Sequence, residues 1–115
     1  MNKDCVFCKK IREELNITFP GGDDTVIYFE PLNPVTPGHL LIVPTKHVED
    51  FSENINVSSR VMAEAAILAK NMGDCNLITS KGEFATQTIK HLHIHLVPRR
   101  KGDNLKLPWS LTNNT

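Results

Sequence analysis

The stretch that decides the fold reads HLHIHL and spans residues 91–96. Apolar residues alternate with histidines here, and a period of two predicts a β-strand. Leu92, Ile94 and Leu96 then face a core, and the three histidines form a row on the other face of the strand. Three of the chain's five histidines lie in this stretch. Because imidazole titrates near neutral pH, the row favours a chemical role over an ordinary polar sheet face.

Strand-like and helix-like segments surround this stretch. We expect strands at residues 25–30, 39–43, 75–80 and 89–97, a short helix at 9–15 and a long helix at 57–72. Apolar residues recur at i, i+4, i+7 and i+11 from Val61 to Met72, and Gly73 supplies the stop. A Pro-Gly-rich turn is expected at 20–24. The prediction is an α+β fold with an antiparallel sheet of about five strands, a long helix and a short N-terminal helix.

Length and composition describe one ordinary globular domain. The 115 residues are 40% hydrophobic and 23% charged, which predicts a single domain over residues 1–115 with a flexible tail at about 103–115. No apolar run reaches the roughly 18 residues that a membrane span needs. Thirteen basic residues balance thirteen acidic ones, so we expect no nucleic-acid or membrane partner. Three cysteines without an apolar leader predict a cytoplasmic protein.

Two chemistries fit the histidine row. Histidines two apart on a strand can supply two imidazoles to one Zn²⁺ ion. Alternatively, one histidine attacks phosphorus while a neighbour assists, and this is favoured because a three-histidine zinc site usually takes its third ligand from another element. Ser80, Gln87 and Thr88 lie just upstream and carry donors that suit phosphate oxygens. Residues 99–101, Arg-Arg-Lys, either attract a polyphosphate or form a solvated patch.

Three blocks of sequence resemble the histidine triad (HIT) family of nucleotide hydrolases and transferases. The first is ATQTIKHLHIHLV at 85–97, the second includes NPVTPGH at 33–39 and PTKH at 44–47, and the third is CVFCKKI at 5–11. They follow one another in the family's order. The Cys-x-x-Cys pair in the third block is similar to that of zinc-bearing bacterial-type members.

The resemblance implies a mechanism. His93 attacks the α-phosphorus of a dinucleoside polyphosphate or a nucleoside phosphoramidate and forms a covalent nucleotidyl-histidine, which water hydrolyses. The carbonyl of His91 orients the His93 ring, and His95 contacts phosphate and assists the leaving group. The implied phosphate-binding residues are Ser80, Gln87 and Thr88, and the implied walls of the base site are Phe7, Leu32 and Leu41.

Some positions depart from the family pattern. Pro31 stands where the family often has an acid that binds ribose, with Glu30 beside it. Thr86 replaces a common glycine, so that a side chain occupies a place where backbone usually approaches phosphate. Ser80 replaces a common asparagine. These differences keep open a nucleotide-binding or partner-binding protein with little turnover.

A structural zinc site is also implied by the resemblance. Its ligands would be Cys5, Cys8, His47 and His91, a closed set of two thiolates and two imidazoles. A zinc-dependent hydrolase that uses the three histidines of the row as ligands stays as an alternative. The family's habit of pairing implies a homodimer, and a second, small-residue set on the long helix suits a partner helix. That set is Met62, Ala66 and Ala69.

Overall fold

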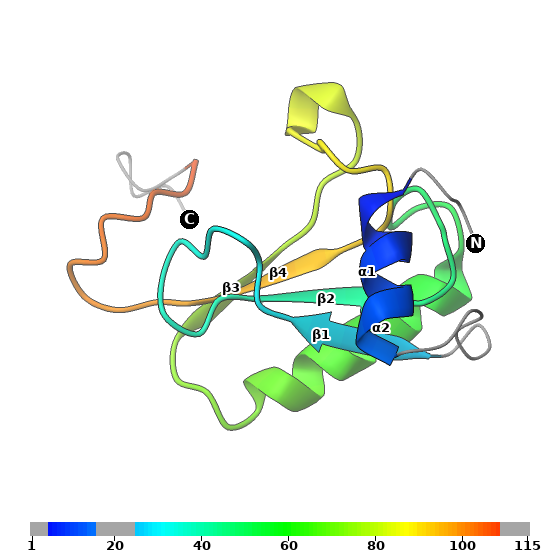
Figure 1. Cartoon of the computed structure of the whole chain (residues 1–115). Helices are drawn as coiled ribbons and strands as arrows, with labels where there is room; N and C mark the ends of the chain where they lie inside the picture. The colour runs from blue at the N-terminus through cyan, green and yellow to red at the C-terminus, as the bar shows by residue number, and fades with distance from the viewer. Residues whose placement is uncertain (1–4, 16–24, 109–115) are drawn as a thin grey trace.

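The computed structural model describes residues 5–15 and 25–108 of the chain (Figure 1). This part of the chain has an α+β fold, as predicted. Its elements are α1 (Val6–Leu15), β1 (Val26–Phe29), β2 (Leu40–Pro44), α2 (Ile55–Ala69), β3 (Cys75–Ile78), the short 3-10 helix η1 (Glu83–Ala85) and β4 (Ile94–Pro98). None of the described helices is long and apolar enough to cross a bilayer. The predicted turn at 20–24 lies outside the described residues.

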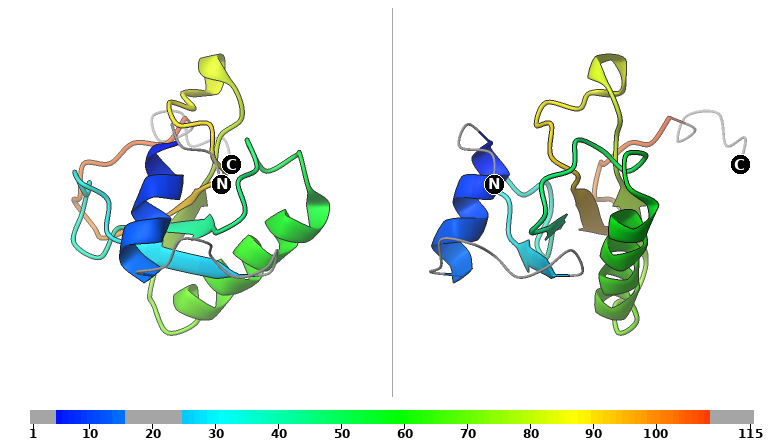
Figure 2. Two further views of the ribbon diagram at one scale, coloured as in Figure 1. Left: turned by 45° about the vertical axis from the view of Figure 1, so that its right-hand side comes forward. Right: turned by 90° about the vertical axis from the view of Figure 1, so that its right-hand side faces the viewer.

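The four strands form one antiparallel sheet in the order β1-β2-β4-β3. α1 covers one face of the sheet and α2 covers the other (Figure 2). Side chains alternate along β2, so that Leu41 and Val43 pack with α1 while Ile42 packs with α2. β2 is therefore apolar on both faces, which explains its unbroken run of aliphatic residues.

α2 buries the apolar stripe that the sequence predicts. Asn54 caps the helix, its side-chain oxygen accepting a hydrogen bond of 3.1 Å from the backbone N–H of Val57. Val61 and Ala65 are fully buried. Ala69, assigned above to an outward-facing set, also packs against this core, so that assignment is wrong for Ala69. The helix ends three residues earlier than predicted, and a turn brings Met72 back onto the core.

The strand that carries the histidines is shorter than predicted. It begins at Ile94, and four strands form the described sheet instead of about five. Pairing with β2 ends at Ile42↔Ile94, and the N–H of Leu92 donates instead to the carbonyl of Val48 at 2.8 Å. The alternation survives outside the ladder, because Leu92 still faces the α2 core. His91 and His93 accordingly both contact Phe7 of α1, on the opposite side of the sheet from Leu92.

Candidate functional site

A cleft of about 500 Å³ opens on the α1 side of the sheet. α1, the start of the β1–β2 loop, the loop after η1 and the histidine segment all contribute to it. Its lining includes Phe7, Phe29, Leu32, Leu41, His93 and His95. An apolar wall thus faces two imidazoles across a space that suits a small molecule.

One ring nitrogen of His93 is hydrogen-bonded to the backbone, and the other carries a lone pair. The Nδ1 of His93 lies 2.8 Å from the carbonyl oxygen of His91. A carbonyl only accepts hydrogen bonds, so Nδ1 carries the proton and Nε2 is bare in the neutral ring. Burial lowers the pKa of His93, although the hydrogen bond to His91 opposes this shift. The edge of Phe7 packs against the ring at 4.9 Å between centroids and limits its rotation.

His95 is held in the opposite tautomer by His39, which directly precedes the other central strand, β2. The backbone N–H of Val35 donates to His39 Nδ1 at 3.1 Å, so the proton of the neutral His39 ring is on Nε2. His39 Nε2 lies 2.9 Å from His95 Nδ1 and donates to it. The remaining proton of His95 is therefore on its Nε2. Burial, with the nearby His93 and His39, lowers the pKa of His95 to about 4, and burial also lowers the pKa of His39.

His39 was not among the predicted site residues. It stands in the second sequence block, 56 residues from His95 in the chain. Only the pairing of β2 with β4 brings the two rings together, since Leu40 lies opposite Leu96. The available signal in the sequence was a histidine directly before an apolar strand. A polar ring that is buried at such a place needs a hydrogen-bond partner.

The donor-rich loop reaches the cleft in part. Thr86 and Thr88 line it. Ser80 and Gln87 are not among its lining residues. The Gln87 amide instead accepts from the N–H of Gly82 at 2.9 Å and donates to the carbonyl of Glu49 at 2.6 Å.

The predicted apolar walls differ in exposure. Phe7 and Leu41 are buried, whereas Leu32 is 99% exposed and stands at the rim of the cleft. Thr86 has a φ of 66°, a left-handed conformation that is unusual for a β-branched residue. The backbone at this position thus has the geometry that glycine adopts most readily.

A second cluster joins the start of α1 to the histidine segment. The ligand atoms of Cys5, Cys8, His47 and His91 all lie within 4.8 Å of one another. His91 is fully buried, and its Nε2 donates to the carbonyl of Pro44 at 2.9 Å, which leaves Nδ1 facing the two sulfur atoms. Burial lowers the pKa of His91 to about 4. A neutral imidazole with a bare nitrogen, held by an outer hydrogen bond, is suited to bind a metal.

This donor set can hold a metal ion. Two sulfurs and two imidazole nitrogens match the tetrahedral preference of zinc. Among the described residues, this is the one group of three or more such side chains close enough to share an ion. His93 and His95 do not belong to it, so the geometry does not favour the alternative in which the whole row binds zinc.

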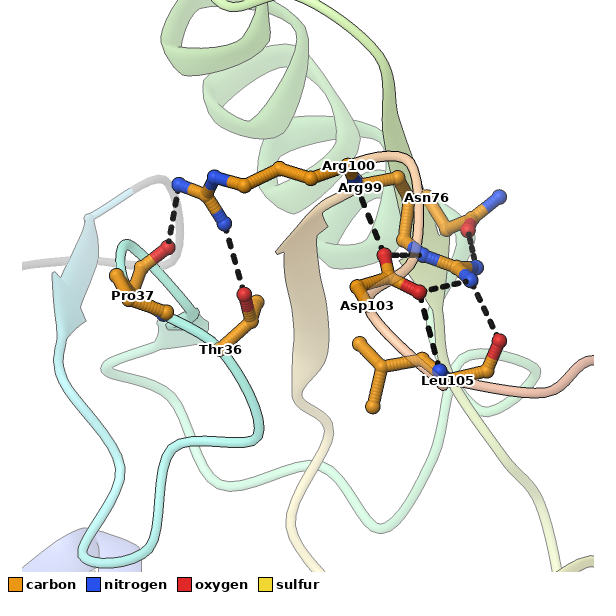
Figure 3. A network of polar contacts seen from close by, with 7 residues as sticks. All are labelled: Thr36, Pro37, Asn76, Arg99, Arg100, Asp103 and Leu105. Atoms are coloured by element: carbon orange, nitrogen blue, oxygen red, sulfur yellow. Dashed lines mark hydrogen bonds and ion pairs between the residues drawn. The ribbon is translucent and has the colours of Figure 1, made fainter.

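The basic residues after β4 do not face the cleft as a free patch. The Arg99 guanidinium binds Asp103 at 2.9 Å and Asn76 at 2.7 Å (Figure 3). Arg100 donates to the hydroxyl of Thr36 at 2.7 Å. Both side chains therefore tie segments of the chain together, and neither lines the cleft as a polyphosphate-attracting patch would. Arg100 is nevertheless exposed to solvent. Both arginines also fix the first part of the predicted tail at Asp103.

Comparison with known proteins identifies the family of the chain. The model of the HIT domain family matches residues 12–102. An uncharacterized HIT-like protein of Methanocaldococcus jannaschii is 34% identical over 105 residues, which cover 86% of this chain and 81% of that protein. The adenylylsulfatase HINT3 of Arabidopsis thaliana is 33% identical over 100% of this chain, which spans 62% of that longer protein.

Solved structures give the same answer. A HIT family hydrolase from Clostridium thermocellum superposes with a TM-score of 0.74 at 32% identity, covering 93% of this chain and 100% of that one. A histidine triad protein from Clostridium difficile gives 0.73 at 31% identity, covering 92% and 99%. With the histidine segment, the sheet and the family match all in agreement, the chain belongs to the HIT domain family.

Proposed function

We propose that this HIT protein is a nucleotide hydrolase or transferase that cleaves at the α-phosphate of dinucleoside polyphosphates or nucleoside phosphoramidates. The observation that carries the proposal is the 2.8 Å contact between His93 Nδ1 and the His91 carbonyl, since it leaves Nε2 bare in the cleft. The neighbouring structures named as HIT family hydrolases support the reaction class.

In the proposed reaction, the lone pair of His93 Nε2 attacks phosphorus. The bond from phosphorus to the leaving oxygen or nitrogen breaks, and the Nε2–H of His95 donates a hydrogen bond that stabilises the charge on the leaving group. A leaving amine takes its proton from solvent. The imidazolium of the covalent adduct keeps its Nδ1 hydrogen bond to the carbonyl of His91, which stabilises the positive charge. Water then attacks phosphorus, the P–N bond breaks, and the electron pair returns to His93 Nε2. The nucleoside monophosphate leaves, and one proton of the water is released to solvent.

The walls of the cleft define the expected substrate. We assign the base to the apolar side made by Phe7, Leu41 and, at the rim, Leu32. We assign phosphate oxygens to Thr88, with Ser80 and Gln87 as predicted further contacts. Pro31 lines the cleft where a ribose-binding acid is common in the family, so we expect weak discrimination at the ribose hydroxyls.

The test is a substrate panel. Diadenosine polyphosphates, adenosine phosphoramidate and adenylyl sulfate (the last because one relative is named an adenylylsulfatase) are incubated with the protein, and released AMP is measured. We expect AMP from at least one of them. A protein that binds these nucleotides without releasing AMP would be the nucleotide-binding alternative and would contradict the proposal.

Substitution of the nucleophile gives the first specific prediction. His93→Ala should lower kcat by about 10³-fold or more, the scale of loss on removing a nucleophile from a covalent enzyme. Brief incubation of the wild-type protein with substrate, followed by denaturation and mass measurement, should show a nucleotidyl adduct that the variant lacks. Near-normal turnover by His93→Ala would contradict the mechanism, provided that its circular dichroism matches that of the wild type.

We further propose that Cys5, Cys8, His47 and His91 hold a structural zinc ion. When bound, the ion would supply rigidity only, because all four positions of its tetrahedron are filled by protein ligands. By fixing His91 it would also steady the carbonyl that orients His93. No disulfide joins any of the three cysteines, and thiolate ligands favour a reducing compartment, so we propose a cytoplasmic location.

We also propose a homodimer formed through the outward face of α2. Large apolar side chains remain exposed there: Ile55 at 80%, Ile67 at 65% and Met62 at 49%. Two copies related by a two-fold axis could cover these side chains. Sedimentation equilibrium at micromolar concentration should give twice the chain mass, and Met62→Glu should shift it toward the monomer. A wild-type monomer at these concentrations would contradict the proposal.

A further inference from the structure

Arg100 lies just after β4, and its guanidinium binds the turn that precedes β2. One terminal nitrogen donates to the hydroxyl of Thr36 at 2.7 Å, and the other donates to the carbonyl of Pro37 at 3.1 Å (Figure 3). The backbone N–H of Arg100 donates to the Asp103 carboxylate at 2.9 Å, so the backbone from which the Arg100 side chain extends is also fixed. Because the guanidinium group is planar and rigid, its two hydrogen bonds fix the orientation of the two acceptors as well as their distance from Arg100.

The bound turn spans residues 35–39 and packs closely on the end of β4. Thr36 is buried, and its carbonyl accepts a hydrogen bond of 3.1 Å from the N–H of His39. Gly38 has a φ of +88°, and a Cβ at this position would lie 3.1 Å from a ring carbon of Pro98. Arg100 and Pro98 thus hold the same turn from the same strand end.

The turn determines which nitrogen of His39 carries the proton. Its first residue, Val35, presents a backbone N–H to His39 Nδ1 at 3.1 Å. Because this group can only donate, the proton of the neutral ring is placed on Nε2, which donates to His95 Nδ1 at 2.9 Å. The proton of His95 must then be on its own Nε2. Without Val35 at this distance, both tautomers of His39 become accessible, and the direction of the His39–His95 hydrogen bond is no longer set.

We propose that Arg100 is a positioning residue that, by holding the 35–39 turn, fixes the tautomers of His39 and His95 so that His95 presents an Nε2 proton to the cleft. The inference rests on the proposed function, since only there does that proton serve the leaving group. It extends the site by a residue that touches neither the cleft nor the two rings.

The test pairs a spectroscopic readout with a kinetic one. In protein labelled with ¹⁵N-histidine, the ring nitrogen shifts at neutral pH should show the Nε2–H tautomer for both His39 and His95. In Arg100→Ala these shifts should move toward a tautomer mixture. kcat on the best substrate of the panel should fall about 10-fold with KM within twofold, because one hydrogen-bond donor to developing charge contributes about 10²–10³-fold and only part of it is lost.

Two further variants keep the inference testable if Arg100→Ala folds poorly. Thr36→Val removes one acceptor of the fork and should shift the tautomers by less than Arg100→Ala does. Arg100→Lys keeps the charge but has a single donating nitrogen in place of the guanidinium group, so its shifts should lie between those of the wild type and those of Arg100→Ala. Arg60→Ala, which removes an exposed arginine from α2, should leave the shifts and kcat unchanged.

The outcomes separate the two proposals. Wild-type tautomers in Arg100→Ala and Thr36→Val, with both variants folded, would overturn the inference. Shifted tautomers with an unchanged kcat would also overturn it, because the proton of His95 would then have no use in the reaction. A wild-type protein that releases no AMP, but whose tautomers shift in Arg100→Ala, would overturn the proposed function and leave the tautomer control standing.

Discussion

At the scale of single residues, the three histidines His91, His93 and His95 differ in which ring nitrogen carries the proton, because their hydrogen-bond partners differ. The carbonyl of Pro44 turns the Nδ1 of His91 toward two cysteines. The carbonyl of His91 leaves the Nε2 of His93 bare, and His39 leaves a proton on the Nε2 of His95. The roles that we propose for the three rings, a metal ligand, a nucleophile and a hydrogen-bond donor to the leaving group, rest on these partners.

Thr86 offers a prediction at the same scale. Its φ of 66° is costly for a β-branched side chain, by about 1–2 kcal/mol, whereas glycine loses about 0.5–1 kcal/mol through backbone entropy. Thr86→Gly should therefore raise the free energy of unfolding by about 0.5–1 kcal/mol, as measured by urea denaturation.

Thr88 provides the matched control, since it is not among the described residues with a positive φ. Thr88→Gly should lower the free energy of unfolding by a similar amount. If both glycine variants destabilise the protein equally, the backbone at Thr86 is not strained and the prediction fails.

At the scale of elements, α1 depends on its anchor. A ten-residue helix is marginal alone in water. Phe7 and Ile11 pack it onto the sheet, and Cys5 and Cys8 tie its first turn to the histidine segment. Because Phe7 is also a wall of the cleft, the anchor of α1 and the shape of the cleft are linked.

Metal removal should therefore act on α1 first. We expect chelation to increase amide hydrogen exchange in Val6–Leu15 while Ile55–Ala69 stays protected, and to lower Tm by about 10 °C. Cys8→Ser should reproduce this effect, and Cys75→Ser, a thiol outside the cluster, should not. Metal content near zero in protein purified without added zinc, with α1 already protected, would contradict the anchor.

At the scale of the whole molecule, one sheet serves two cores. The core on the α2 side includes Ile42 and Leu96, and the core on the α1 side includes Leu41 and Val43. The cleft lies on the α1 side, so the α2 core can keep the sheet rigid without blocking the site. His39 is buried beside this sheet, and its partner His95 is half-buried at the edge of the cleft.

Acid should destabilise the fold through His39 and His95. Both have a pKa below 6.5 in the folded protein, that of His95 about 4, so the unfolded chain binds protons first as pH falls. Their contribution to the free energy of unfolding is fully present above about pH 6.5. It decreases as the pH falls below that value, for His95 until about pH 4. The free energy of unfolding should drop by roughly 1–2 kcal/mol for His95 alone between pH 7 and pH 5.

Urea denaturation at the two pH values measures this drop, and His95→Gln is the control because glutamine does not titrate. The variant should lose less stability between pH 7 and pH 5 than the wild type does. An equal loss in both proteins would show that His95 is not protonated more readily in the unfolded chain.

The sequence alone determined the α+β class and the side that most of the apolar residues face, although not that of Ala69. Alternation from Leu92 to Leu96 and the apolar stripe from Val61 are local patterns, and burial follows them directly. The resemblance in the three blocks pointed to the Cys5–His91 metal cluster and to the carbonyl that orients His93, because those blocks carry the residues themselves.

Only the tertiary structure decided how distant polar groups are paired. The contact of His39 with His95, and the binding of Arg100 to the turn at Thr36, join segments 56 and 64 residues apart. The late start of the histidine strand likewise depends on its pairing with β2, which stops at Ile42↔Ile94. Strand register and hydrogen-bond direction depend on atoms brought together by folding, and no local period in the chain encodes them.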